Sequence, residues 1–269
     1  MLRSRYATLL DMLDARAADS PTRGFTFLDD GETEGARVTF PELARRARAL
    51  AAPFAVLRVT AADLFDGALA LDLFATTARV LTGTLLAIVC GLVVGVGLGA
   101  RPLALRVVGP WVDGVRSVPP VLVYPLCLLA LGYSETSRVA TIAFGAFGVV
   151  VLPVAQAVAS TARERRDAAR LAGMSGLDLV WRLYVPEAAP ALATGVRLAL
   201  SQALIVAVVT EMLVSPPRGL GVRALTALQE YRTERLWQVM LTAGALAMSL
   251  NTVVRAVERR VHRRDDAAT

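Results

Sequence analysis

The stretch VLTGTLLAIVCGLVVGVGLGA, residues 80–100, decides the fold of this chain because it carries no charged side chain. A helix of about 20 apolar residues crosses the hydrocarbon core of a bilayer, since each residue advances an α-helix by about 1.5 Å. The stretch has that length. We therefore expect a membrane-spanning helix here.

Four further stretches extend this prediction. Residues 139–162 and 236–254 are uncharged over a similar length. Residues 117–134 are uncharged but shorter, and Pro119, Pro120 and Pro125 predict a kinked or partly irregular span. Residues 188–213 form the fifth stretch and contain Arg197 and Glu211. The sequence thus predicts an all-α, polytopic membrane helix bundle with five spans.

The composition agrees with a membrane protein. Of the 269 residues, 55% are hydrophobic, and the mean hydropathy is +0.53, a balance that ordinary soluble domains do not reach. The formal net charge of +6 arises from Arg clusters that suit an anionic cytoplasmic leaflet, so nucleic acid is not expected as a partner. Cys90 and Cys127 lie in apolar runs, and His262 is the single histidine. We expect no metal site, no histidine-based catalysis and no bound cofactor.

The orientation of the spans follows from the Arg-dense C-terminal stretch VVRAVERRVHRR, residues 253–264, which should remain cytoplasmic. Alternation then places residues 214–235 outside, 163–187 inside, 133–138 outside and 101–116 inside. Arg197 should snorkel or pair near the cytoplasmic side, and Glu211 should lie near the outer end, where it lines or closes a translocation path. About 21 Å of helix separates the two, so they should not pair directly.

A glycine repeat lies within the first span. Gly91, Gly95 and Gly99 recur at every fourth position, and Gly97 stands beside them. Small residues at this spacing allow another helix to approach closely. Helix packing is the expected role, and widening of a pore is the alternative.

Residues 1–52 read differently from the rest. They predict a helix at 6–18, strands at 25–28 and 36–40 around a turn at 29–31, and a helix at 41–52, an α+β piece too small to bury its own core. The segment from 7 to 52 resembles the start of fatty acyl-AMP ligases. The phosphate loop of such enzymes is absent downstream, so we expect a remnant without adenylation activity. A transition segment at 53–75, a membrane domain at 76–264 and a tail at 265–269 follow.

One charged segment, RERRDAARLAGMSGLDLVWRLYVPEAAP, separates two apolar stretches at residues 163–190. Asp167 to Ala172 can form a short helix with a small Ala face, and Gly173 permits a backbone turn that other residues disfavour. A second helix through residues 177–183 should end before Pro186. The sequence therefore predicts a rigid knuckle outside the bilayer.

This segment resembles the EAA loop of ABC importer permeases. The spacing of that family's pattern is reproduced in full, with Asp in place of the usual Glu, by Asp167, Ala168, Ala169, Gly173, Leu183 and Pro186. Residues 71–264 further resemble the branch that imports taurine, alkanesulfonates and nitrate, through RSVPP at 116–120, TGVRLAL at 194–200 and GLG at 219–221. The candidate residues of a translocation path or gate are Pro119, Pro120, Tyr124, Arg197 and Glu211.

The resemblance implies a non-catalytic, multi-pass subunit of the bacterial inner membrane. Its partners would be a cytoplasmic ATPase that uses the ATP, a second permease copy, a periplasmic or lipid-anchored solute-binding protein and the bilayer. Permeases of this branch usually begin with one more apolar helix, and residues 1–52 stand in its place, which predicts a gene fusion with the N-terminal piece outside. The alternatives are an ion-gradient-driven carrier and a non-functional fusion whose membrane part anchors an adenylation remnant.

Overall fold

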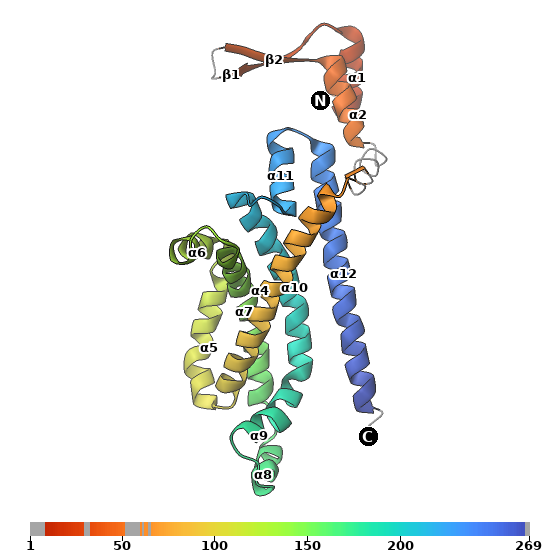
Figure 1. Ribbon diagram of the computed structural model, residues 1–269. Coiled ribbons are helices and arrows are strands. Elements are labelled where there is room, and N and C mark those ends of the chain that lie inside the picture. Colours follow the sequence, from red (N-terminus) through yellow and green to blue (C-terminus); the bar gives the residue numbers. More distant parts are fainter. Residues whose placement is uncertain (1–8, 30–32, 52–59, 61, 64–65, 267–269) are drawn as a thin grey trace, which may run out of the picture. The chain divides into compact units, whose positions relative to one another are not determined.

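The computed structural model describes residues 9–29, 33–51, 60, 62, 63 and 66–266, and it is mostly helical (Figure 1). The chain divides into two compact units. Residues 1–66 and 227–238 form one unit, and residues 67–226 and 239–269 form the other. Each unit is described by itself.

The N-terminal unit contains a β-hairpin between two helices. Helix α1 (Leu9–Asp19), strands β1 (Gly24–Asp29) and β2 (Thr33–Thr39) and helix α2 (Phe40–Ala51) follow one another. The strands pair antiparallel, with Gly24 opposite Thr39 and Phe25 opposite Val38. The predicted order of helix, hairpin and helix is confirmed, although β2 begins earlier than the expected residue 36. The turn expected at residues 29–31 lies largely outside the described residues.

The larger unit is built from long apolar helices. These are α4 (Ala68–Gly99), α5 (Pro102–Ser117), α6 (Tyr124–Leu131), α7 (Glu135–Ala159) and α10 (Val185–Val214), together with α11 (Leu220–Gln229) up to Thr226 and α12 (Thr233–Asp266) from Val239 onward. Four stretches are long and apolar enough to cross a membrane: Ala68–Gly99, Glu135–Ala159, Leu177–Val214 and Thr233–Ala256. A fifth crossing is a broken pair, Pro102–Ser117 with Pro120–Leu131, bent by 90°. The prediction of an all-α membrane bundle is confirmed, with four spans, or five when the bent pair is counted as one span.

The second span differs from its predicted position. We expected a cytoplasmic loop at residues 101–116 and a span at 117–134, whereas α5 already occupies Pro102–Ser117. The charged residues Arg106, Asp113 and Arg116 interrupt the apolar run and hid the helix from a search for uncharged stretches. The predicted kink is present, since the chain turns at Pro119 and Pro120 through a short 3-10 helix, η1 (Pro120–Val123), into α6.

The glycine repeat of α4 packs against α7. A Cβ added at Gly91 would lie 2.7 Å from Val150 Cγ1, and one added at Gly95 would lie 2.8 Å from the Val151 carbonyl oxygen. Ala87 continues the same face and is buried. The two helices can approach this closely only where side chains are small. The expected packing role is confirmed, and Gly97, on another face, meets nothing within 4 Å.

Candidate functional site

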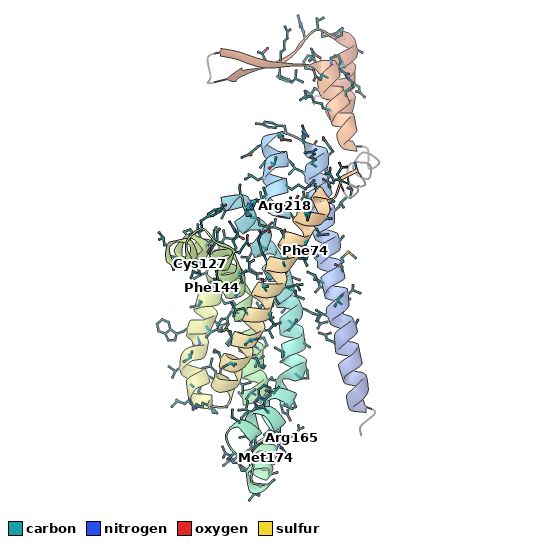
Figure 2. All side chains as sticks on the ribbon, in the orientation of Figure 1. Phe74, Cys127, Phe144, Arg165, Met174 and Arg218 are labelled. Atoms are coloured by element: carbon teal, nitrogen blue, oxygen red, sulfur yellow. The ribbon has the colours of Figure 1, made fainter. Side chains whose placement is uncertain are left out.

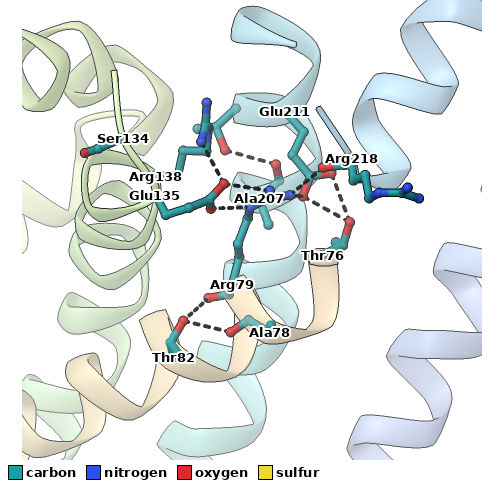
Figure 3. Close-up of polar contacts among 12 residues, drawn as sticks. Thr76, Ala78, Arg79, Thr82, Ser134, Glu135, Arg138, Ala207, Glu211 and Arg218 are labelled. Carbon is teal, nitrogen blue, oxygen red and sulfur yellow. Dashed lines mark hydrogen bonds and ion pairs between the residues drawn. The ribbon is translucent and has the colours of Figure 1, made fainter. Parts of the chain in front are cut away.

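A buried cluster of charges joins three helices at one end of the larger unit (Figure 3). Arg79 of α4 donates from Nε and Nη2 to the two carboxylate oxygens of Glu135 on α7, at 2.7 and 2.9 Å. Its Nη1 donates to Glu211 Oε1 of α10 at 2.7 Å and to the Arg218 carbonyl oxygen at 2.8 Å. A planar guanidinium suits this bidentate geometry. Arg79 therefore ties α4, α7, α10 and the chain after α10 together.

The carboxylate of Glu211 has no exposed surface and accepts further hydrogen bonds. Thr76 Oγ1 lies 3.0 Å from each of its oxygens, and the Gly221 amide donates to Oε2 at 2.9 Å. The glycine at 219 is required here, because its φ is +151° and an added Cβ would lie 2.5 Å from the Glu211 carboxylate. The backbone thus closes over the carboxylate.

A second arginine balances the charge of the cluster. Arg138 Nη1 donates to Glu135 Oε1 at 2.9 Å, and its guanidinium carbon lies 4.8 Å from the centre of the Tyr133 ring. The Tyr133 hydroxyl donates to the Val214 carbonyl oxygen at 2.8 Å. Two arginines thus face two glutamates. Arg79, Arg138 and Glu211 are buried, whereas the Glu135 side chain is 57% exposed at the edge of the cluster. Pairing of this kind offsets the hydration that the buried charges lose.

The sequence identified only one charged residue of this cluster. Glu211 was expected near the outer end in a path or gate, and the structure places it in a closed cluster with Arg79. Arg79 directly precedes the uncharged stretch and was not identified as a candidate, and Glu135 and Arg138 lie in residues 133–138, which were expected outside the membrane. A usable signal was present: Arg79 lies only one residue from the span, where an unpaired charge is costly.

Of the other candidate path residues, Arg197 forms an ion pair away from this cluster. Its Nε lies 3.5 Å from Glu258 Oε1 on α12. Pro120 packs at α7, where a Cβ added at Gly145 would lie 2.9 Å from its ring, while Pro119 is exposed. Tyr124 is buried, and its hydroxyl has no hydrogen-bond partner within the described part of the chain.

The predicted knuckle forms a helical turn at the other end of the larger unit. Figure 2 places Arg165 and Met174 there, at the end opposite Arg218. Helix α8 (Arg163–Leu171) ends in a Schellman motif, because the Gly173 amide donates to the Arg170 carbonyl oxygen at 3.0 Å and the Met174 amide to that of Ala169 at 3.0 Å. Gly173 has a φ of +82°, as this motif requires. The predicted helix and glycine turn are confirmed.

We expected the second helix of the knuckle to end before Pro186, but it does not. Helix α9 (Leu177–Leu179) passes through a π-helical turn at Val180–Tyr184 directly into α10. Pro186 stands in the first turn of α10, where a missing amide hydrogen is tolerated, and the wider π-turn accommodates its ring. The knuckle is therefore continuous with the span that carries Glu211.

The remaining knuckle residues divide between exposed and buried positions. Asp167 and Ala168 are exposed, Ala169 is buried and Leu183 is half-buried. Asp167 Oδ2 lies 3.8 Å from Arg163 Nε. An ion pair between Arg165 and Glu187 joins α8 to the start of α10. Three large apolar side chains are nevertheless exposed: Leu171 by 90%, Leu177 by 75% and Trp181 by 64%.

Comparison with known proteins gives one family. The model of the family described as "Binding-protein-dependent transport system inner membrane component" matches residues 83–265. A probable ABC transporter permease protein of Brucella melitensis is 31% identical over 79% of this chain and 86% of its own length. The taurine transport system permease protein TauC of Escherichia coli K12 is 28% identical over 73% of this chain and 71% of its own.

Further similarities agree with these. The putative aliphatic sulfonates transport permease protein SsuC of Bacillus subtilis is 26% identical over 68% of this chain and 66% of its own. Among solved structures, a chain of the MetNI methionine ABC transporter in an inward-facing conformation is similar, with a TM-score of 0.61 and 21% identity. The match covers 75% of this chain and 98% of that one. At this identity, the likeness supports the fold alone.

Proposed function

Because this chain belongs to the family of binding-protein-dependent transport system inner membrane components, we propose that it forms a solute path and takes its driving force through residues 163–187. The chain is the permease subunit of an ABC importer, a non-catalytic multi-pass protein of the inner membrane. An ATPase subunit and a substrate-binding protein are the partners that this membership implies. Membership of this family also argues against the alternative of an ion-gradient-driven carrier.

The observation that carries the coupling proposal is the apolar tip of the knuckle. Leu171, Leu177 and Trp181 are exposed beside charged neighbours on a segment that joins two spans. Such a group of apolar side chains in water indicates a contact with a partner. We infer that the partner is the ATPase, which Asp167, Ala168, Ala169, Gly173, Leu183 and Pro186 help to position.

The stiffness of the knuckle supports this role. Its first helix has a closed cap, the ion pair between Arg165 and Glu187 holds that helix to α10, and α9 continues into α10 without a loop. Movement of the tip would therefore be transmitted to α10, whereas a loose loop would absorb it. In this scheme, ATP-driven closure of the ATPases shifts the population between inward-open and outward-open states.

The solute proposed is small and of the sulfonate, taurine or nitrate class. The names of TauC, SsuC and a similar nitrate import permease protein of Synechocystis, NrtB, suggest this class. Two permease copies would enclose the path. The candidate path residues remain Pro119, Pro120, Tyr124, Arg197 and Glu211, with Glu211 acting within the closed cluster described above. The division into segments 1–52, 53–75, 76–264 and 265–269 is part of the same proposal, with residues 7–52 as an inactive remnant similar to fatty acyl-AMP ligases.

Co-purification tests the coupling. Leu171→Asp should weaken retention of the ATPase by at least tenfold, because a buried Leu contributes about 1.5–3 kcal/mol to a contact. Gly173→Val should have a similar effect, since an L-residue at this φ costs roughly 1–2 kcal/mol and distorts the turn. The measurement is the amount of ATPase recovered with tagged permease at a series of salt concentrations.

The matched control is Leu228→Asp, which places the same charge at an exposed apolar position of α11. It should leave ATPase recovery unchanged. If Leu171→Asp and Gly173→Val both retain as much ATPase as the parent, the knuckle is not the docking element and the coupling proposal is wrong.

A further inference from the structure

One tyrosine side chain joins the end of the short helix α6 to the end of the long helix α10. The Tyr133 hydroxyl donates to the carbonyl oxygen of Val214, the last residue of α10, at 2.8 Å. The carbonyl oxygen of Ser215 lies 3.3 Å from the same hydroxyl. The last carbonyl groups of a helix have no partner within that helix, and here the tyrosine supplies one. The two helix ends are thereby held together.

A second contact sets the direction of the Tyr133 ring. The guanidinium carbon of Arg138 lies 4.8 Å from the ring centre, and Arg138 Nη1 is in turn paired with Glu135 Oε1. The face of an aromatic ring attracts a cation, so this contact favours one orientation of the ring. Both partners belong to the first turn of α7. The ring is therefore oriented by α7 while its hydroxyl reaches α10.

Helix α6 has a sharp turn at each end. Before it, the chain bends by 90° between α5 and η1, and Pro120 of η1 packs at Gly145 of α7. After it, Gly132 has a φ of +72°, a left-handed conformation that ends the helix. Leu126 and Leu129 of α6 are 64% and 86% exposed, so little of the described chain covers this face. A short helix with such turns on both sides can pivot as a rigid body.

Helix α10 connects this link to the knuckle. It begins directly after the π-turn and has 30 residues, so it is about 45 Å long. Figure 2 places Cys127 of α6 toward the end that carries Arg218, away from Arg165 of the knuckle. A movement of the knuckle that shifts α10 would therefore act on Val214 and, through the hydrogen bond, on Tyr133.

We propose that Tyr133 is a positioning residue through which α10, moved from the knuckle, shifts α6 during the ATPase cycle. The inference rests on the proposed function. It adds the side chain and the helix that carry the movement onward at the end of the unit opposite the knuckle. Because Tyr133 acts through α6, its hydroxyl matters for the response of α6 and not for the response of α10.

Thiol labelling of the assembled transporter tests the link. In a background in which Cys90 and Cys127 are replaced by Ala, Leu129→Cys reports on α6 and Leu213→Cys reports on the last turn of α10. These side chains are 86% and 59% exposed. Permease with its ATPase bound, in lipid nanodiscs, is labelled with a maleimide without nucleotide and after trapping with ATP and vanadate. The readout is the ratio of the two rates for each thiol, with and without Tyr133→Phe, which removes only the hydroxyl.

In the parent, nucleotide trapping should change the labelling rate of both thiols. Tyr133→Phe should reduce the change at Leu129→Cys by about two- to tenfold, the effect of one hydrogen bond on an equilibrium. The change at Leu213→Cys should stay as in the parent. Tyr231→Phe is the matched control, because it removes the same hydroxyl from a side chain that is 88% exposed, and it should alter neither response.

An unaltered response of Leu129→Cys in the Tyr133→Phe permease would overturn the inference. Loss of both responses together would also overturn it, since that result would mean a general loosening of the helices and not a missing link. A parent that binds its ATPase but whose Leu129→Cys rate ignores nucleotide would show that α6 does not follow the cycle. Failure to recover the ATPase with the parent would instead count against the proposed function.

Discussion

Glu211 is a carboxylate with no exposed surface, and its stability depends on the groups that donate to it. Arg79 Nη1, Thr76 Oγ1 and the Gly221 amide all lie within 3.0 Å of its oxygens. Removing a charge from water costs several kcal/mol, and only an opposite charge with further hydrogen bonds offsets that cost. The residues of this cluster therefore stabilise the protein together, and removing one of them should leave the charges of the others without partners.

Arg79→Gln is expected to destabilise the protein by about 3–5 kcal/mol, because it leaves Glu211 charged and buried without a counter-ion. The double variant Arg79→Gln, Glu211→Gln should recover part of the loss, since both buried charges are then absent. The measurement is the free energy of unfolding in mixed micelles by chemical denaturation.

Arg182→Gln provides the comparison for this experiment. Its partner Asp178 lies 3.5 Å away, and both side chains are more than half exposed, so the change should cost about 1 kcal/mol or less. A double variant that is as unstable as the sum of its parts would mean that Arg79 and Glu211 do not act together.

At the scale of helices, the local sequence predicted the apolar stretches that cross the bilayer. It missed the helical segments whose charged side chains are stabilised by partners far away along the chain. The uncharged run at 80–100 was enough to identify a span, because a helix in the hydrocarbon core needs about 20 apolar residues in succession. The true start of α4 at Ala68 was missed, since Arg79 is acceptable there only through Glu135 and Glu211, far away along the chain. Helix α5 was missed in the same way, because its charged side chains interrupt the apolar run.

The knuckle was predictable in part. Gly173 requires a left-handed backbone conformation, and that requirement is local, so the turn after α8 could be predicted from sequence. The continuation of α9 through a π-turn into α10 could not, because a proline usually marks the end of a helix. No local pattern distinguishes Pro186 inside a first helical turn from a proline that follows a helix.

The close approach of α4 and α7 gives a prediction for a pair of glycines. Gly95→Ala should destabilise the protein by about 1–3 kcal/mol, because the new Cβ would lie 2.8 Å from the Val151 carbonyl oxygen. Gly97→Ala, on the open face of the same helix, should be neutral or stabilising by up to about 1 kcal/mol. Thermal unfolding of both variants in the same detergent makes the comparison. Equal destabilisation by the two substitutions would contradict the packing role of the repeat.

Considered as a whole, the larger unit separates its two kinds of site along its length. The cluster around Arg79 includes the Arg218 carbonyl oxygen. Figure 2 shows Arg218 at one end of the unit and the knuckle, with Arg165 and Met174, at the other. With the bent pair counted as one span, the number of crossings is five, and an odd number places the two flanks of the bundle on opposite sides of the membrane. The function proposed therefore depends on which end faces the cytoplasm, and the Arg-dense stretch at 253–264 predicts that the knuckle does.

Accessibility of single thiols from the two sides of the membrane decides this orientation. In the background lacking Cys90 and Cys127, Ser175→Cys lies in the exposed turn of the knuckle, and Thr226→Cys lies on the exposed surface of α11. A membrane-impermeant maleimide should label Thr226→Cys in intact spheroplasts and Ser175→Cys only in inverted vesicles, because the bilayer excludes the charged reagent. The two variants control for each other, since each is reactive in the preparation where the other is protected. Labelling of Ser175→Cys in intact spheroplasts would put the knuckle beyond the reach of any cytoplasmic ATPase, and a chain with that orientation could not be driven as proposed.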